Sequence, residues 1–158
     1  MKLTGPWDRD AVDRFLADAR VPVRIGCRTP ADDPWLVSLW FEWDGAVHCA
    51  TGADADLVTF LRSDDHVSFE VSTNDPPYKG VRGRGRATVS PDPDKRYLRS
   101  LMERYLGGTD NELGERLLRP EREEVHVRIE PERLHSWDYS RRMPAGTDSD
   151  ASADADVD

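Results

Sequence analysis

Three arginines and three glycines are interleaved in the segment GVRGRGRATV, residues 80–89. Arginine binds carboxylates and phosphates through charge-assisted hydrogen bonds. The segment is therefore compatible with an Arg-Gly box for RNA, a glycine loop around a phosphate, or an ordinary β-strand. Its glycines follow the order GxxGxG with no helix directly after them, which does not match the dinucleotide-binding GxGxxG pattern. We interpret residues 80–89 as a strand.

A strand would place Arg82, Arg84 and Arg86 on one face and Gly83 and Gly85 on the other, because successive side chains alternate. Glycine weakens a strand unless something must approach the backbone closely. The glycine face therefore suits either a tight bend in a barrel or contact with a flat ligand ring. The arginine face would meet water, acidic partners or phosphate.

The other reactive side chains do not form a recognisable motif. The four histidines never occur at a metal-binding spacing such as HxxxH. No serine lies in a GxSxG elbow, so serine hydrolysis has no support. Cys27 and Cys49 are far from any CxxC spacing and are interpreted as buried free thiols. We predict no metal site and no catalytic side chain supplied by the protein.

The charge balance limits the possible partners. The chain of 158 residues carries 31 Asp and Glu against 22 Lys and Arg, a formal net charge of −9. An acidic surface repels phosphate backbones and anionic lipids, so we expect no nucleic-acid partner and no membrane partner. Only three of the basic residues are lysines, and abundant Asp with scarce Lys suggests a halophilic source, such as a haloarchaeon. Without an apolar leader or an 18-residue apolar window, a soluble, cytoplasmic protein is expected.

Periodicity indicates strands alternating with short helices. Apolar residues at i, i+3, i+4 and i+7 predict a helix over 9–19, and Asp44-Gly45 predicts a hairpin joining 35–43 to 46–50. The run WLVSLWFEW should be buried on both faces, or on one face by the core and on the other by a second subunit. Further helices are expected within 53–64, after the capping segment 90–93, and at 111–118. Further strands are expected at 23–27, 66–72, 80–89 and 124–130, with a short edge at 134–139.

These elements indicate a mainly β fold with helices, an α+β arrangement of a small antiparallel barrel with one hydrophobic core. We divide the chain into an N-terminal helix packed on the barrel (1–20), the barrel domain (21–142) and an acidic tail (143–158). The tail is rich in Asp, Ala and Ser and is predicted to be disordered.

Several motifs, taken in order, resemble one known family. WLVSLWFEWDGAVHCATG is followed by FLRSDDHVSFEV, NDPPYKGVRGRGRATV, a helix with RYLG, and HSWDYS. This succession, over roughly residues 20–142, is similar to the pyridoxamine 5'-phosphate oxidase-like flavin-binding split barrels. The resemblance implies a six-stranded antiparallel split β-barrel with short flanking helices. It also implies a homodimer that holds FMN, or in some relatives a deazaflavin, at two sites between the subunits.

The resemblance also implies roles for particular residues. Ser38, Leu39 and Trp40 match the strand that runs along the isoalloxazine ring in the family. Thr51 matches the hydroxyl that meets the cofactor phosphate. Trp137, in HSWDYS, is a C-terminal aromatic residue that, near such an interface site, could pack on the ring or instead seal the end of the barrel.

The sequence departs from the family after Thr51. Many relatives carry a basic residue, commonly lysine, in the following helix to bind the phosphate, whereas this chain has Asp54 and Asp56. Carboxylates repel a doubly charged phosphate. Either FMN binds poorly, or other cations bind its phosphate, and Lys79, Arg82 and Arg84 are then the expected substitutes, reaching the phosphate from a neighbouring strand or from the other subunit.

The resulting hypothesis is a flavin-dependent oxidoreductase, with FMN or a deazaflavin as cofactor and an unassigned small-molecule substrate. The cofactor would perform the redox chemistry, and the protein would orient and shield it. The alternative is a non-catalytic split barrel that binds a cofactor or small ligand such as a flavin or haem. A third possibility is a structural dimer with an empty crevice.

Overall fold

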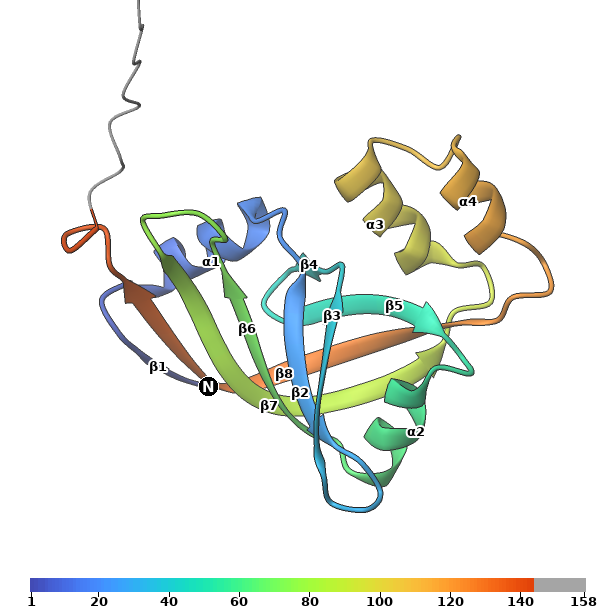
Figure 1. The fold of residues 1–158 in the computed structure, drawn as a ribbon, viewed down its shortest axis with the longest axis horizontal. Coiled ribbons are helices and arrows are strands. Elements are labelled where there is room, and N and C mark those ends of the chain that lie inside the picture. Colours follow the sequence, from blue (N-terminus) through green and yellow to red (C-terminus); the bar gives the residue numbers. More distant parts are fainter. Residues whose placement is uncertain (144–158) are drawn as a thin grey trace, which may run out of the picture.

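A single curled β-sheet dominates the structure, a computed structural model that describes residues 1–143 (Figure 1). The strands are β1 (Lys2–Thr4), β2 (Val23–Arg28), β3 (Pro34–Leu39), β4 (Glu42–Trp43), β5 (Val47–Gly52), β6 (His66–Ser72), β7 (Lys79–Pro91) and β8 (Glu124–Asp138). The helices are α1 (Arg9–Asp18), α2 (Asp56–Ser63), α3 (Arg96–Leu106) and α4 (Glu112–Leu117). Residues 144–158 of the predicted tail lie outside the described residues.

The sheet order is β3-β2-β6-β7-β8-β5-β4, with β1 added in parallel alongside β8. All other pairings are antiparallel. The mainly β class with flanking helices is therefore confirmed. The predicted number of six strands is wrong, because eight strands are present among the described residues. The additional strands β1 and β4 have three and two residues, too short to produce a recognisable alternation in the sequence.

The predicted strand over 35–43 is interrupted. β3 ends at Leu39 and pairs with β2, while β4 pairs with β5 across the Asp44-Gly45 turn. The hairpin is therefore real but involves only the last residues of the predicted strand. β3 is not buried on both faces within the chain, since Leu36 is 66% exposed. The apolar run reflects two short strands on either side of a bend.

The long strands β7 and β8 curl across the molecule, and an irregularity between them explains the glycines of the opening motif (Figure 1). Arg84 pairs with Arg133 but Gly85 pairs with Pro131, so the register shifts by one residue. A Cβ on Gly85 would lie 2.0 Å from the carbonyl oxygen of Glu130. This β-bulge also accommodates Pro131 in the middle of β8. β8 therefore continues unbroken where the sequence predicted two separate strands.

Gly83, in the same segment 80–89, leaves room for side chains of the core. A Cβ on Gly83 would lie 2.5 Å from the ring of Phe69 and 2.8 Å from a methyl carbon of Leu134. Of the two interpretations of the glycine face, the bend is therefore the one that the structure supports. The predicted alternation is confirmed, with Arg82 exposed and Val81 buried.

Helices close both sides of the curled sheet. Val12 and Leu16 of α1 are fully buried in the core, as are Leu57 and Leu61 of α2. Asp8 caps α1 by accepting a hydrogen bond from the backbone N–H of Ala11. No side chain caps α2, since Ala55 occupies the cap position. α3 and α4 stand together above β5 (Figure 1).

Candidate functional site

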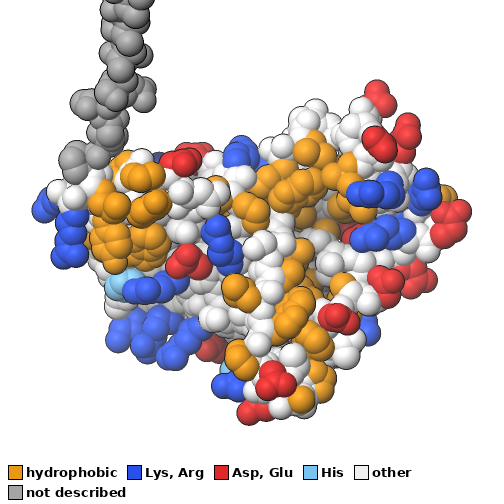
Figure 2. Space-filling view, viewed as in Figure 1, with side chains coloured by type: hydrophobic (Ala, Val, Ile, Leu, Met, Phe, Trp, Pro, Cys, Tyr) orange, Lys and Arg blue, Asp and Glu red, His pale blue; other side chains and the backbone are white. Residues whose placement is uncertain are grey.

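Four of the predicted cofactor residues converge on one crevice. Ser38 and Leu39 at the end of β3, Trp40 just after it, and Thr51 on β5 line a cavity of about 290 Å³. Its remaining wall is formed by Pro22, Ala50, Leu98, Leu101, Leu117, Arg122 and Glu124. Figure 2 shows hydrophobic side chains gathered where α3 approaches the end of β3. Segments far apart in the sequence thus build a pocket with apolar walls and a charged end.

The bend after β3 is held by Tyr105 of α3. Its hydroxyl oxygen lies 3.2 Å from the carbonyl oxygen of Val21 and 3.3 Å from that of Phe41, so its single proton can be donated to either, and it accepts a hydrogen bond from the N–H of Phe41. The ring of Trp40 stacks on the ring of Tyr105 with centroids 5.3 Å apart. Tyr105 therefore positions the predicted ring-contacting residue Trp40 and joins α3 to the crevice.

The charged end of the crevice lies beside Thr51. Arg122 precedes β8, and its Nε donates to a carboxylate oxygen of Glu124 at 2.5 Å. The Glu124 side chain is 1% exposed, and its second carboxylate oxygen is buried without a hydrogen-bond partner. A Cβ on Gly52 would lie 3.2 Å from Nη2 of Arg122. The guanidinium group is therefore adjacent to the residue that follows Thr51.

Sequence reasoning missed both Arg122 and Glu124. The signal that could have found them is the pairing of β8 with β5, in which Glu124 lies opposite Gly52 and Val125 lies opposite Thr51. That pairing joins two strands separated by more than seventy residues. A linear reading of the sequence does not reveal it.

Asp54 lies on the same side as Arg122. The two residues line a shared outer cleft together with Arg116 and Arg119. One carboxylate oxygen of Asp54 would be 2.8 Å from a Cβ on Gly52. These three arginines therefore line the same cleft as Asp54, which lies in the segment where a basic residue was expected.

Lys79, Arg82, Arg84 and Trp137 do not reach this crevice within one chain. Val125, the partner of Thr51, pairs with Pro91 at the opposite end of β7. Arg84 is seven residues from Pro91, roughly 23 Å along the strand, and Lys79 is roughly 40 Å away. These cations therefore lie away from Thr51 along the sheet of one chain. Their action from another subunit stays a prediction.

Trp137 and Lys79 lie at the far end of the sheet. Trp137 pairs with Gly80, and Lys79 pairs with Asp138. The Trp137 ring is 5.2 Å from the ring of Tyr139, and its indole Nε1 is buried without a hydrogen-bond partner. A buried N–H without an acceptor is uncommon in folded proteins.

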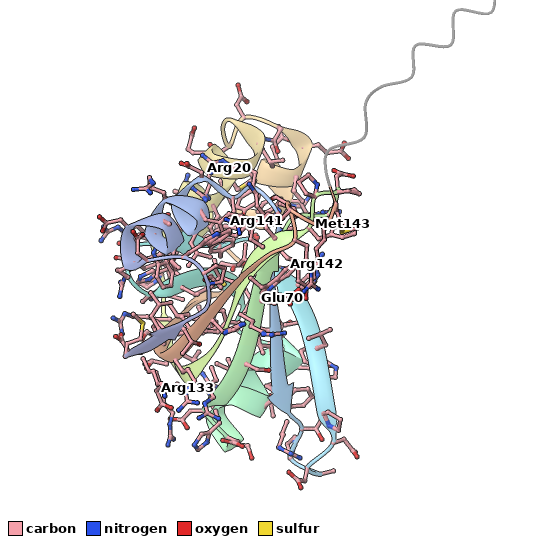
Figure 3. All side chains as sticks on the ribbon, turned by 90° about the vertical axis from the view of Figure 1, so that its left-hand side faces the viewer. Arg20, Glu70, Arg133, Arg141, Arg142 and Met143 are labelled. Carbon is pink, nitrogen blue, oxygen red and sulfur yellow. The ribbon has the colours of Figure 1, made fainter. Side chains whose placement is uncertain are left out.

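Arg82 and Arg84 instead line a second, larger cavity of about 530 Å³ on the outer face of the sheet. The other lining residues are Arg24, Gly26, Leu36, Ser68, Phe69, Glu70, Gly83, Arg133 and His135. Figure 3 labels two of them, Glu70 and Arg133, which come from β6 and β8. The two cavities share no lining residue.

Two histidines behind the crevice form a polar cluster with α3. Nδ1 of His48 is 2.9 Å from Nε2 of His126, and Nε2 of His48 is 2.8 Å from a carboxylate oxygen of Asp44. The ring of Tyr97 stacks on His126 with centroids 3.5 Å apart. Burial and the neighbouring His48 lower the pKa of His126, and the hydrogen bond from His48 lowers the pKa of Asp44. The sequence did not predict this cluster, because His48 and His126 are 78 residues apart in the chain.

Two further predictions concern possible ligands. Cys27 and Cys49 are both buried and free, as predicted, and burial raises the pKa of each thiol. Possible metal-ligand atoms of Asp64, Asp65 and His66 lie within 4.8 Å of one another at the surface. Asp65 also pairs with Arg86 at 2.7 Å, so this cluster already has a cation partner.

Comparison with solved structures shows a shared fold. The conserved hypothetical protein Rv2991 from Mycobacterium tuberculosis is 24% identical, with a TM-score of 0.73, and the match covers 94% of this chain and 96% of that one. An F420 reductase is 19% identical over 82% of this chain and 97% of its own, with a TM-score of 0.65. A protein from Mesorhizobium loti described as FAD-binding is 19% identical over 82% and 93%, with a TM-score of 0.59.

No protein-family model matches the sequence, and no curated protein matches it. In the part of the chain that the structure describes, no helix has the length and apolar character needed to cross a bilayer.

Proposed function

We propose that this chain binds a flavin-type cofactor, FMN or a deazaflavin, in the crevice formed by Ser38, Leu39, Trp40 and Thr51, and acts as an oxidoreductase on a small-molecule substrate. The observation that carries the proposal is the convergence of two separate segments, Ser38–Trp40 and the strand that bears Thr51, on one cavity. The solved structures named as an F420 reductase and as an FAD-binding protein share this fold and support it.

The crevice residues fit the two ends of such a cofactor. Leu39, Trp40, Leu98 and Leu101 offer apolar contacts to a flat ring. At the other end, the Thr51 hydroxyl group can donate a hydrogen bond to a phosphate, and Arg122 can pair with it. We propose that Arg122 supplies the cation that the helix after Thr51 lacks.

The size of the crevice supports a site completed by a second copy. Binding pockets for molecules of this size typically span about 300–1,000 Å³, and the crevice has about 290 Å³. One chain therefore encloses only part of a flavin. We propose a homodimer in which the partner covers the rest of the ring, and Lys79 and Trp137 at the far end of the sheet are the residues we propose for that role.

A bound flavin would supply the hydride or electron transfer, and the chain's own residues would bind, orient and shield it. Backbone groups of Ser38–Trp40 would position the ring edge. Tyr105 would keep Trp40 in place through the bend that it holds. Leu98 and Leu101 would exclude water from the ring face.

The second candidate is a cofactor carrier without turnover. Asp54 and the buried carboxylate of Glu124 near the phosphate end favour it, because they weaken phosphate binding and leave less interaction energy for an active enzyme. A bound flavin that a nicotinamide donor reduces, and that then passes its electrons to an acceptor, would distinguish the enzyme from the carrier.

The proposal is tested by titrating FMN and a 5-deazaflavin into the full chain and into Ser38→Trp. Ser38 is exposed and lines the crevice, so a tryptophan would fill the cavity without displacing the core. Ser68→Trp, on an exposed β6 position outside the crevice, is the matched control. Saturable binding to the wild type and to Ser68→Trp but not to Ser38→Trp is expected. Absence of binding to the wild type, or equal binding to Ser38→Trp, contradicts the proposal.

A further inference from the structure

The larger cavity on the outer face of the sheet has the composition of a binding site. It has about 530 Å³ and is bounded by β2, β3, β6, β7 and β8. This volume lies within the usual range of roughly 300–1,000 Å³ for small-molecule pockets. Leu36, which is 66% exposed, and the two glycines Gly26 and Gly83 give it an apolar part.

Its charge is opposite to that of the whole protein. Four arginines and one histidine line the cavity, against the single carboxylate of Glu70, in a chain of net charge −9. Figure 2 shows Lys and Arg side chains gathered over β1 and the neighbouring part of β7. Placing several guanidinium groups around one cavity is unfavourable unless an anion neutralises them. A basic cavity on an acidic protein therefore favours an anionic occupant.

The guanidinium groups are also available to a ligand. Within residues 1–143, Arg24, Arg82, Arg84 and Arg133 form no ion pair with a carboxylate. Arg86, the next arginine on the same face of β7, pairs with Asp65 and Glu132 and does not line the cavity. Arg84 therefore lines the cavity and has no ion pair among residues 1–143, whereas Arg86 lies outside the cavity and is paired.

Arg24 gives a second, independent indication. Its Nη2 donates to the side-chain oxygen of Asn74 at 2.9 Å, which holds the guanidinium group in place. Its Nη1 is buried and has no hydrogen-bond partner. Since buried donors in folded proteins are nearly always paired, an oxygen atom of a bound molecule is the expected partner.

We propose that this cavity binds a small organic anion, a carboxylate or phosphate carried on an apolar body. The acidic group pairs with Arg82, Arg84 and Arg133, and the apolar body lies against Leu36. The site is separate from the flavin crevice and does not depend on the function proposed for that crevice.

A second copy of the chain is a poorer occupant of the cavity by itself. Two such faces would bring eight guanidinium groups together around a two-fold axis, and their repulsion opposes a direct contact. A dimer across this face would need an anion between the subunits. The cavity therefore calls for an anion in either arrangement.

The site is tested with 8-anilinonaphthalene-1-sulfonate, a fluorescent aromatic anion, titrated into the full chain at low salt. Saturable binding is expected, about tenfold weaker in the Arg82→Gln/Arg84→Gln double variant, because two charge-assisted contacts are lost. Arg86→Gln, matched in strand, face and charge, should bind like the wild type. Circular dichroism checks that each variant is folded.

Two cavity-filling variants separate this site from the crevice. Ser68→Trp should lose the sulfonate probe and keep FMN, and Ser38→Trp should lose FMN and keep the probe. Displacement of the probe by benzoate or by phenyl phosphate identifies the preferred acidic group. Equal affinity in the double variant and in Arg86→Gln, or displacement by neither compound, would overturn the proposal.

Discussion

Nε of Arg122 lies 2.5 Å from a carboxylate oxygen of Glu124, and both side chains line the crevice that contains Thr51. This pair places one cation and one buried anion at the end of the crevice where a cofactor phosphate is proposed. The two charges act on a phosphate in opposite directions, so substitutions at the two positions give opposite predictions.

Arg122→Gln should weaken FMN binding about tenfold, because a charge-assisted hydrogen bond contributes about 1.5 kcal/mol when its donor is partly exposed. Riboflavin, which lacks the phosphate, should bind the variant and the wild type equally. The measurement is the ratio of the two dissociation constants from fluorescence titration. Arg62→Gln, an exposed arginine on α2 outside the crevice, is the control. An equal loss of both ligands would show that Arg122 acts on the fold and not on the phosphate.

Glu124→Gln should strengthen FMN binding relative to riboflavin. The substitution removes a buried negative charge near the phosphate and frees the guanidinium group of Arg122. An increase of about threefold to tenfold in the preference for FMN is expected from removing one like charge at this distance. An unchanged preference would mean that the phosphate does not lie near Glu124.

Tyr105→Phe should destabilise the bend after β3. The hydroxyl group donates its single proton to the carbonyl group of Val21 or of Phe41 and accepts from the N–H of Phe41. Removing it should lower the free energy of unfolding by about 1–2 kcal/mol, since backbone groups lose their partner. Urea unfolding gives this value, and the flavin affinity should fall in the same variant because Trp40 stacks on this ring. A loss of stability with unchanged flavin affinity would show that the bend does not influence flavin binding.

Gly85→Ala should be strongly destabilising. The new methyl group would lie 2.0 Å from the carbonyl oxygen of Glu130 at the β-bulge, so the backbone must move. Overpacking of this kind costs about 3 kcal/mol or more. Gly107→Ala is the comparison, because a methyl group there meets no atom within 4 Å and the cost of about 1 kcal/mol comes from its left-handed φ of +75° alone. Similar losses for both variants would mean that the bulge can relax.

The stability of the protein should decrease as the pH falls below about 6.5, the ordinary pKa of histidine. Burial and His48 lower the pKa of His126 in the folded chain, so the unfolded chain binds the proton more readily and acid favours unfolding. The groups around His126 include Glu42 and Asp92, which oppose the shift, and Arg128, which adds to it. The urea midpoint should drop between pH 7.5 and pH 5.5 in the wild type and should drop less in His126→Gln. Parallel changes in the two proteins would assign the pH dependence to other groups.

The local elements of this fold could be predicted from the sequence because their signals are local. The Asp44-Gly45 turn, the helix within residues 9–19 and the alternation along residues 80–89 follow from turn chemistry, helical periodicity and strand geometry. The interruption of 35–43 could not be predicted, because Tyr105, sixty-four residues away from Phe41, holds it. The bulge at Gly85 likewise depends on pairing with Pro131.

The candidate site was predictable only in part for the same reason. Ser38, Leu39, Trp40 and Thr51 were found through resemblance to a family and do share a crevice. Arg122 and Glu124 belong to the crevice only because β8 pairs with β5, a long-range contact that a single sequence does not display. Arg82 and Arg84 share one strand face, as the alternation predicts, and in the structure this face lines a different cavity.

A crystal structure of the full chain grown with FMN tests the central claim most directly. The account predicts electron density for the isoalloxazine ring against Ser38–Trp40, with the phosphate between Thr51 and Arg122 and a second subunit covering the exposed part of the ring. Flavin density in the outer cavity among Arg24, Arg82 and Arg133, with an empty crevice, would contradict it.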